Sequence, residues 1–497
     1  MFKKVLVANR GEIAVRVMCT LRELGVASVA VYTDADRASL HVRHADEALA
    51  LGADPRAYLD AERLVALAKQ SGAQALHPGY GFLSENAEFA ELAAAGGVTF
   101  VGPPPSAIRA MGSKQRARAA MAAAGVPIVP GGGAGTLEEA KATAARVGYP
   151  VMVKATDGGG GKGMRLCLRE EELASALERT RSEAEKAFGS GDVYIEKALV
   201  EPRHVEVQVL GDQHGNLVHL FERDCSLQRR HQKIVEETPC PVLDAATRDA
   251  LCGVAVQGAR SLGYHSAGTF EFLLDRGGNF YFLEMNTRLQ VEHPITELVT
   301  GTDLVREMLC VAAGEPLTLT PSARGVAIEA RLCAEEPARG FVPSPGSIER
   351  LVMAAGPGVR VDSGVYPGAT VSPHYDPLLA KLSVWAPTRE RALARLLRAL
   401  GECTVVGIAT NLAFLERLVA TPEVAAGAYD TGFVERRAAE LTAPLADTND
   451  DAFVAAAAVL AHLDAGRGAA NGRDGASAGS GALAPWVAVE RAERLGR

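Results

Sequence analysis

The stretch TFEFLLDRGGNFYFLEMN, residues 269–286, decides the fold of the central part of this chain. Two alternating runs of apolar and polar residues flank Gly277 and Gly278, a pattern typical of a β-hairpin with a two-residue turn. With such a turn, Arg276 pairs with Asn279 and the register of the hairpin follows by counting. The stretch therefore predicts antiparallel sheet structure.

Two carboxylates meet on one face of this predicted hairpin. The count places Glu271 directly opposite Glu284, with Leu273, Phe280 and Phe282 on the same face. Opposite side chains lie about 5 Å apart, where two like charges repel by roughly 3 kcal/mol at an effective dielectric constant near 20. The apolar neighbours favour burial over the alternative, a solvent-facing strand with its carboxylates apart. A cation between the carboxylates would offset their repulsion.

A divalent metal ion is the cation that this arrangement indicates. Mg²⁺ is held in proteins by one or two carboxylates together with substrate phosphates, and Mn²⁺ takes similar oxygen ligands. Glu271 and Glu284 are therefore predicted metal ligands, and Asn286, next on that face, could add an oxygen.

Three polar residues continue the alternation beyond Asn286. Arg288, Gln290 and Glu292 share the parity of Glu284. An arginine to bind an anion, an amide to orient it and a carboxylate to accept its proton suit the activation of a small oxyacid beside a phosphate. A solvated edge strand is the alternative for this stretch.

The run GGGGKGM, residues 158–164, satisfies G-x-G-x-x-G, which dinucleotide folds, kinases and ordinary loops share. A dinucleotide fold places a helix directly after the glycines, whereas residues 165–168 are extended and mostly apolar in character. The run therefore predicts a flap between two strands whose backbone N–H groups bind phosphate, with Lys154 adding positive charge. A mobile glycine loop without a ligand is the alternative.

The remaining periodicities divide the chain into regions. The first hundred residues alternate strands and helices as in βαβ units of a parallel sheet, with strands at 5–8, 28–33, 75–76 and 98–101 and helices at 12–24 and 59–71. Further hairpin strands are predicted at 151–155, 164–168, 204–210 and 217–221, and a helix at 389–400 follows a proline-rich stretch. The last residues form an alanine-rich helix and a Gly/Ala/Ser-rich segment expected to be flexible.

The length and composition of the chain argue against several classes of function. A length of 497 residues suggests about three domains. The net charge of -8 offers no long-range attraction to nucleic acid or to anionic membranes, and no apolar run is long enough to span a bilayer. Eight cysteines without a C-x-x-C pair indicate free thiols in a reducing compartment, so we expect a cytoplasmic protein.

Six motifs together resemble biotin carboxylase. They are NRGEIAVR at 9–16, HPGYGFLSEN at 77–86, MGSK at 111–114, the glycine run, ERDCSLQRRHQK at 222–233 and EMNTRLQVEHP at 284–294. They occur in the family's order, and the resemblance covers residues 1 to about 440. The longer motifs are specific to biotin-dependent carboxylases among ATP-grasp enzymes.

The resemblance implies a multidomain fold of α/β and α+β parts. It comprises a Rossmann-like N-terminal domain at 1–112, an ATP-grasp domain at 113–316 with a mobile lid at about 130–203, and a C-terminal biotin carboxylase domain at 317–440. The helix and flexible tail occupy 441–497.

The resemblance also implies roles for individual residues. ATP contacts would come from Lys114, Lys154, Gly160, Gly161, Glu196, Lys197, Ala198, Leu199, His204, Gln228, His231, Glu271 and Glu284. Bicarbonate would be held by Lys233, Arg288, Gln290 and Val291, and Glu292 would deprotonate it. Arg331, in EARLCAEEP, would stabilise the biotin enolate, and Tyr80 would lie near the biotin ring. The implied catalytic set is Arg288, Glu292, Arg331 and Lys233, and the metal ligands are Glu271, Glu284 and Asn286.

Partners follow from what the chain lacks. No lysine follows Lys381, so biotin is expected on a separate carrier protein and the carboxyltransferase in separate subunits; a sequence that is part of a longer chain is the alternative. The resemblance implies a homodimer. Acetyl-CoA carboxylase, and with it fatty acid biosynthesis, and propionyl-CoA carboxylase are both compatible with the sequence.

Three rival interpretations remain. Another ATP-grasp ligase would use the same flap and metal pair, but Arg331 and the HPGYGFLSEN loop argue against it. A nucleotide-binding subunit without turnover would be expected to lack Glu292 or Arg288, and both are present. A nicotinamide-dependent oxidoreductase would need more glycines than Gly11 in its first turn.

Overall fold

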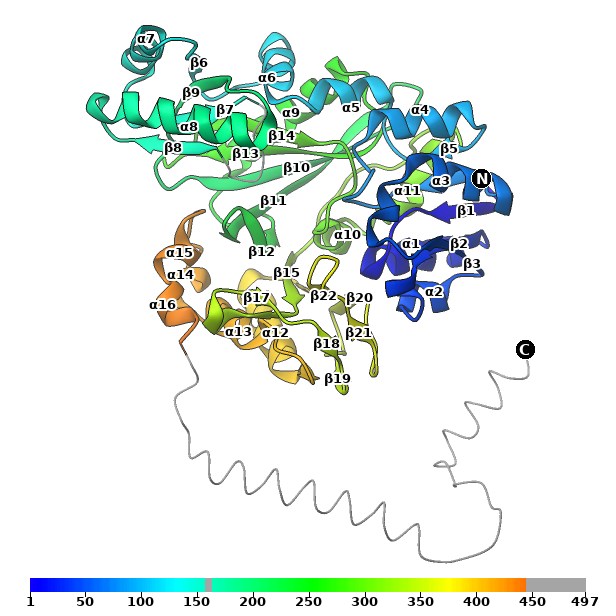
Figure 1. Cartoon of the computed structure of the whole chain (residues 1–497). Coiled ribbons are helices and arrows are strands. Elements are labelled where there is room, and N and C mark those ends of the chain that lie inside the picture. The colour runs from blue at the N-terminus through cyan, green and yellow to red at the C-terminus, as the bar shows by residue number, and fades with distance from the viewer. Residues whose placement is uncertain (157–162, 444–497) are drawn as a thin grey trace, which may run out of the picture. The chain divides into compact units, whose positions relative to one another are not determined.

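The computed structural model describes residues 1–156 and 163–443. Within it, Met1–Thr442 forms one compact unit (Figure 1). No helix in these two described ranges has both the length and the apolar character needed to cross a membrane. The predicted tail helix and flexible segment lie outside the described residues.

The N-terminal region contains the predicted parallel sheet. Its order is β3-β2-β1-β4-β5, with β1 (Lys4–Val7), β2 (Ala27–Thr33), β3 (Glu47–Gly52), β4 (Ala75–His77) and β5 (Thr99–Phe100). The predicted helices are α1 (Gly11–Glu23) and α3 (Ala61–Ser71). The sequence did not predict β3, because in this edge strand only Leu51 is buried and its apolar signal is weak.

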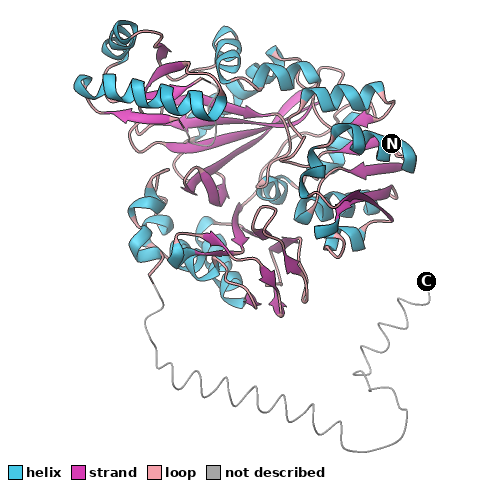
Figure 2. Ribbon diagram, viewed as in Figure 1, coloured by secondary structure: helices cyan, strands magenta, loops and turns pink. Residues whose placement is uncertain are grey.

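One antiparallel sheet runs through the central and C-terminal regions (Figure 2). Its order is β14-β13-β10-β11-β12-β15-β22-β20. The strands are β10 (Arg203–Gly211), β11 (Leu217–Arg229), β12 (Gln232–Thr238), β13 (Ser266–Leu274), β14 (Phe280–Asn286), β15 (Val326–Cys333), β20 (Val359–Ser363) and β22 (Leu378–Ala386). A new domain was expected to begin at residue 317. Because β12 pairs with β15, this one sheet contains strands from both sides of that residue.

The lid region is a second, smaller sheet covered by two helices (Figure 1). Its order is β6-β9-β7-β8, with β6 (Gly131–Gly133), β7 (Val151–Ala155), β8 (Met164–Cys167) and β9 (Val193–Lys197). Helices α7 (Leu137–Val147) and α8 (Leu173–Phe188) share an apolar core with β7 and β9. The glycine run joins the antiparallel pair β7 and β8, so the prediction of strands on both sides of it is confirmed.

The remaining elements are short strands and covering helices. The helices are α2 (Leu40–His44), α4 (Ala87–Ala95), α5 (Pro105–Met111), α6 (Lys114–Ala123), α9 (Ala245–Ser261), α10 (His293–Thr300), α11 (Leu304–Ala312), α12 (Arg389–Glu402), α13 (Leu412–Val419), α14 (Pro422–Ala425), α15 (Phe433–Arg436) and α16 (Ala438–Leu441). The strands are β16 (Glu335–Glu336), β17 (Val342–Pro343), β18 (Gly346–Ser347), β19 (Arg350–Val352), β21 (Thr370–Val371) and β23 (Thr404–Val406). Helix α12 is the predicted helix at 389–400.

The β13–β14 hairpin differs from the prediction at its turn. The Asp275 N–H donates to the Asn279 carbonyl at 2.8 Å, so three residues, 276–278, form the turn in place of two. Gly278 has a φ of 82°, a left-handed conformation that glycine adopts without strain. The register next to the turn is therefore one residue away from the predicted one.

A bulge in β14 then restores the predicted carboxylate pairing. Phe272 lies opposite Phe282, whereas Glu271 lies opposite Glu284, so Leu283 is an extra residue on β14. The one-residue shift at the turn and the extra residue on β14 therefore compensate each other. The prediction that Glu271 faces Glu284 is confirmed, although the count behind it was wrong near the turn.

The bulge also changes which residues share a face. Phe282 is 1% exposed and packs beside Phe272 with ring centroids 6.2 Å apart, on the side of the hairpin away from Glu284. Phe280 packs against the same ring at 5.8 Å. Of the three apolar residues predicted beside the carboxylates, only Leu273 lies on their face, because a one-residue shift turns the strand over.

We predict that Phe282→Ala destabilises the protein by about 3–5 kcal/mol, because it leaves a cavity among packed aromatic rings. Leu283→Ala, one residue along and half-buried, should cost much less. Thermal and denaturant unfolding of both variants measures the difference. Equal destabilisation by the two substitutions would contradict the bulged register.

Candidate functional site

Lys233, at the start of β12, is the centre of the site. Its ammonium group lies 2.5 Å from Glu206 Oε2, 2.8 Å from Glu271 Oε1 and 2.6 Å from Glu292 Oε1. An ammonium has three N–H donors, so each has a carboxylate partner. Burial lowers the pKa of Lys233, but the three carboxylates outweigh it and raise that pKa well above its usual value.

The three carboxylates come from separate elements. Glu206 lies on β10, Glu271 on β13, and Glu292 immediately before α10. All three are at most 4% exposed. Buried like charges repel one another strongly in a medium of low polarity, so their close approach depends on the shared ammonium.

Arg223, on β11, hydrogen-bonds to this cluster and is 0% exposed. It donates to Glu206, to Gln290 Oε1 at 2.9 Å, and to three further acceptors, namely Gln208, Thr269 and Thr296. Gln290 in turn donates to Glu271 Oε1 at 2.8 Å. The buried guanidinium therefore fixes the amide of Gln290 beside the carboxylate cluster.

Glu292 is bound by two cations. Its Oε1 accepts from Lys233, and its Oε2 lies 2.9 Å from an Arg331 nitrogen. Burial raises its pKa, but Lys233 and Arg331 outweigh burial and hold the pKa of Glu292 below its usual value. Glu292 is thus anionic at neutral pH.

Arg331 also donates to Glu236 at 2.6 Å. Burial raises the pKa of Glu236 to about 7, although the charge of Arg331 opposes this.

The stretch after Asn286 is not an edge strand. Strand β14 ends at Asn286, and the chain turns into α10. Gln290 and Glu292 are 3% and 1% exposed, which excludes the solvated alternative. Arg288 donates to Asn286 at 2.8 Å and to Glu85 at 3.0 Å. The loop, and not a continued strand, brings these polar groups together.

The predicted metal ligands differ in their surroundings. Glu271 is saturated by Lys233, Asn286 and Gln290 at Oε1 and lies 3.0 Å from His204 at Oε2. Glu284 is exposed, and no side chain in the described part of the chain hydrogen-bonds to it. Loss of solvent around its carboxyl group and, after that, the charge of Glu271 raise the pKa of Glu284.

Among the three predicted ligands, Glu284 is the one whose carboxylate is open to a hard divalent cation in this arrangement. Glu284 supplies a carboxylate without a cationic partner among the described residues, and Glu271 lies directly across from it. The Asn286 side chain donates to Glu271 and accepts from Arg288, so its oxygen faces the arginine in this arrangement. The structure also brings His204, Glu206 and Glu271 close together, a group that the sequence did not indicate.

The lid contributes a second group of charges. Lys154 on β7 lies 2.5 Å from Glu196 on β9, and Arg118 pairs with the other oxygen of Glu196. Burial lowers the pKa of Lys114, at the start of α6. The charge of Glu284 opposes this effect, and the charge of Lys154 adds to it. Lys114 is therefore within electrostatic reach of both Glu284 and the Lys154–Glu196 pair.

Other expected nucleotide contacts are placed differently. Lys197 donates to the carbonyls of Gly148 and Tyr149 at 3.0 and 2.8 Å, so its ammonium is used within the lid. Ala198 is buried and Leu199 half-buried, directly after β9. Gly160 and Gly161 lie outside the described residues.

The basic residues of the ERDCSLQRRHQK motif, around His231, surround the turn of a hairpin. Strand β11 runs to Arg229, well beyond Phe221 where the sequence predicted its end. Arg230 and His231 have φ of 48° and 65° and form the exposed turn into β12. Gln228 is buried opposite Lys233, so this hairpin carries Lys233 into the site.

The loop at 77–86 anchors the arginine of the site. Glu85 accepts from Arg288 and from the backbone N–H of Thr287. Tyr80 packs against an apolar cluster that contains Leu289. The loop therefore contacts Arg288 and its neighbour Thr287.

Sequence reasoning missed Glu206, Arg223, Glu236 and Glu85 as parts of the site. A signal for Glu206 was present, because His204, Glu206 and Gln208 alternate with valines within one strand. Such polar residues on a fully buried strand need partners. Nothing in the local pattern pairs Glu236 with Arg331, which lies on the neighbouring strand β15.

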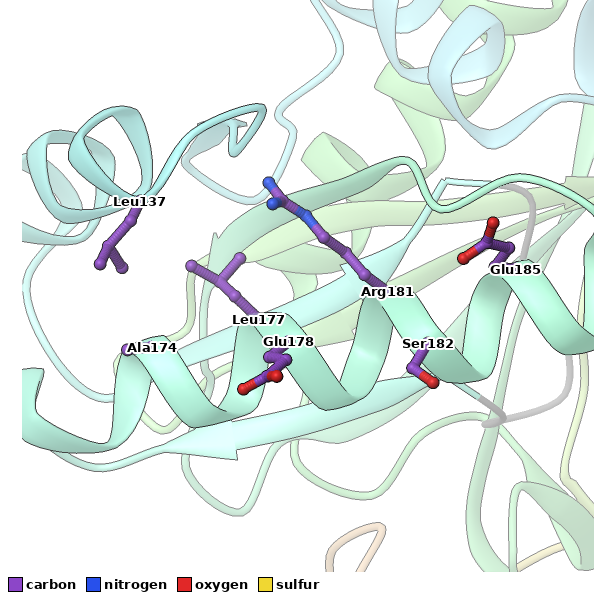
Figure 3. A pocket seen from close by; sticks show the side chains of 7 residues that line it. All are labelled: Leu137, Ala174, Leu177, Glu178, Arg181, Ser182 and Glu185. Atoms are coloured by element: carbon purple, nitrogen blue, oxygen red, sulfur yellow. The ribbon is translucent and has the colours of Figure 1, made fainter.

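A shallow pocket of about 340 Å³ lies elsewhere, on the lid (Figure 3). Leu137 of α7 faces Leu177 and Arg181 of α8 across it. The described residues that line it include none of the charged cluster.

Sequence models of three family regions match the chain in order. "Biotin carboxylase, N-terminal domain" matches 1–108, "Carbamoyl-phosphate synthase L chain, ATP binding domain" matches 113–320, and "Biotin carboxylase C-terminal domain" matches 329–436. The two flanking matches favour this family over other ATP-grasp ligases and over a nicotinamide-dependent oxidoreductase.

Individual relatives agree. The biotin carboxylase of Nostoc sp. is 49% identical over 441 residues, covering 87% of this chain and 99% of that protein. The mitochondrial methylcrotonoyl-CoA carboxylase subunit alpha of Oryza sativa subsp. japonica is 51% identical over 443 residues, which are 87% of this chain. This chain spans only 60% of that longer relative.

A solved structure has the same fold. It is the biotin carboxylase domain dimer of Hydrogenobacter thermophilus 2-oxoglutarate carboxylase, in complex with MgADP, ADP and bicarbonate. The TM-score is 0.85 at 46% identity, covering 90% of this chain and 100% of that one. The chain described here belongs to the biotin carboxylase family of ATP-dependent ligases.

Proposed function

We propose that this chain carboxylates biotin held on a separate carrier protein, with bicarbonate as the carbon source, ATP as the energy source and carboxyphosphate as the intermediate. The observation that carries the proposal is the bonding of Lys233 and Arg331 to the two oxygens of Glu292. This places an anionic proton acceptor between two cations, beside the amide of Gln290. The bicarbonate bound in the Hydrogenobacter thermophilus structure supports it.

Bicarbonate binds, in this proposal, at Arg288, Gln290, Val291 and Lys233. The cations offset its charge and the amide orients it. When the anion shares the Lys233 ammonium, Glu292 loses part of the attraction that depresses its pKa, and it becomes a better proton acceptor. Glu292 then takes the bicarbonate proton.

The deprotonated oxygen attacks the γ-phosphorus of ATP, ADP leaves, and carboxyphosphate forms. Such a transfer needs alignment and charge neutralisation more than covalent participation by the protein. Lys114, Lys154, His204, Gln228 and His231, with Gly160 and Gly161, are the proposed nucleotide contacts. Glu271, Glu284 and Asn286 would hold Mg²⁺ or Mn²⁺, which neutralises phosphate charge when bound.

Carboxyphosphate next breaks its carbon–oxygen bond to phosphate and gives CO₂ and phosphate. Phosphate takes the N1 proton of biotin, and N1 attacks CO₂. Arg331 stabilises the negative charge on the biotin enolate oxygen. Tyr80 is the proposed neighbour of the biotin ring.

The partners also belong to this proposal. We place the carrier and the carboxyltransferase in separate chains, and we expect a homodimer, which the dimeric domain of Hydrogenobacter thermophilus supports. An acetyl-CoA or propionyl-CoA acceptor would be chosen by the carboxyltransferase. Eight unpaired cysteines support a reducing compartment such as the cytoplasm.

We predict that the purified chain hydrolyses ATP only when bicarbonate is present, and faster when free biotin is added. The reason is that bicarbonate is the phosphoryl acceptor and biotin consumes the product. Phosphate release measured with and without each addition tests this. Turnover without bicarbonate, or no response to biotin, would count against the proposal.

We predict that Glu292→Gln lowers kcat by at least about 100-fold, because it removes the proton acceptor while keeping the shape of the side chain. The dissociation constant for ATP, measured by calorimetry, should change by less than about threefold. Glu91→Gln, in an exposed pair with Arg109, is the control and should behave like the unmodified protein. A comparable loss of nucleotide affinity in Glu292→Gln would refute the assigned role.

A further inference from the structure

A second buried lysine reaches the same loop from the C-terminal region. Lys381 on β22 is 0% exposed, and its ammonium donates to the backbone carbonyl of Val291 at 2.9 Å. Val291 directly precedes Glu292. The lysine therefore holds the peptide that carries the proposed base.

Two carboxylates fix the ammonium of Lys381. Glu12 Oε2 lies 3.1 Å away, from the first turn of α1, and Asp362 Oδ2 lies 3.6 Å away, on β20. Both are largely buried. Because the anchors belong to the N-terminal and C-terminal regions, the ammonium has little freedom to move relative to either.

Lys381 and Arg331 act on neighbouring points of the loop. They are cross-strand partners in the register of β15 and β22. Arg331 bonds the Glu292 carboxylate at 2.9 Å, whereas Lys381 bonds the carbonyl one residue earlier. Adjacent strands thus hold both the backbone and the side chain of the same short segment.

Burial of a lysine is costly, and an apolar side chain of similar size is often as stable or more stable at such a place. Here the ammonium bonds a loop carbonyl, which an apolar side chain could not do. The contact does have a use at this carbonyl, because the direction of the Glu292 side chain follows from the peptide before it.

We propose that Lys381 is a positioning residue for proton transfer: anchored by Glu12 and Asp362, it fixes the Val291–Glu292 peptide so that the Glu292 carboxylate stays between Lys233 and Arg331. The inference rests on the proposed function, in which Glu292 is the base. Lys381 itself touches no reacting atom. A displacement of about 1 Å in a reacting group can lower a rate by about 100-fold.

The test uses the full chain with the double substitution Glu12→Gln/Lys381→Met. The second change removes the ammonium, and the first avoids a buried carboxylate without a partner, which could prevent folding. Glu12→Gln alone, which keeps the lysine, is the reference. Arg389→Met, which breaks the partly buried pair with Glu237 away from the loop, is the matched control for a lost ion pair.

Relative to Glu12→Gln, the double variant should lose about 100-fold in bicarbonate-dependent kcat while its ATP dissociation constant changes by less than about threefold. Arg389→Met should lose thermal stability but keep its turnover. In a Glu12→Gln/Glu292→Gln background, Lys381→Met should cost less than about threefold further, because the changes at 292 and 381 act on one group.

Three results would overturn the inference. These are turnover of the double variant within threefold of Glu12→Gln, a matching loss of ATP affinity, or a full additional 100-fold loss in the Glu292→Gln background. None of them contradicts the proposed function as long as Glu292→Gln itself lowers kcat by at least about 100-fold. An active Glu292→Gln protein would instead remove the proposed base, and the role of Lys381 with it.

Discussion

The arrangement of this protein's site depends on one ammonium group. Lys233 bonds three buried carboxylates, Glu206, Glu271 and Glu292, that come from two strands and a helix N-terminus. Without the cation these carboxylates would repel one another in surroundings that screen charge poorly. Removal of one partner from a buried ionic group lowers the stability of the protein by several kcal/mol, because the remaining charge is left uncompensated. Each member of the cluster therefore depends on the others. An anion that shared this ammonium would weaken the attraction that holds the pKa of Glu292 below its usual value.

Further cations hold the cluster from outside. Arg223 uses all its donors on buried acceptors and fixes Gln290, while Arg331 and Lys381 reach from the C-terminal strands to the Val291–Glu292 segment. The continuous sheet explains how residues so distant in sequence meet. Because β12 pairs with β15 and β15 with β22, the strand of Arg331 lies directly beside the strand that carries Lys233, and the strand of Lys381 is the next one in the sheet.

Much of this could be predicted from the sequence, because strong periodicity and turn residues are local signals. The parallel N-terminal sheet, the hairpins and the pairing of Glu271 with Glu284 were predicted. The three-residue turn, which places Phe282 on the other face, and the bulge at Leu283, which restores the carboxylate pairing, were not predicted, because neither has a reliable sequence signature here. The partners of Glu292 were also beyond local reasoning, since Lys233 and Arg331 come from other strands. Edge strand β3 was missed because it buries little apolar surface.

The central claim is that this cluster directs bicarbonate oxygen onto the γ-phosphorus of ATP. The most direct measurement supplies bicarbonate labelled with ¹⁸O, in unlabelled water, and analyses the released phosphate by mass spectrometry at short times. We expect one labelled oxygen in each phosphate, because carboxyphosphate keeps the attacking oxygen on phosphorus when its carbon–oxygen bond breaks. Unlabelled phosphate would show that water attacks ATP directly and would contradict the proposed reaction.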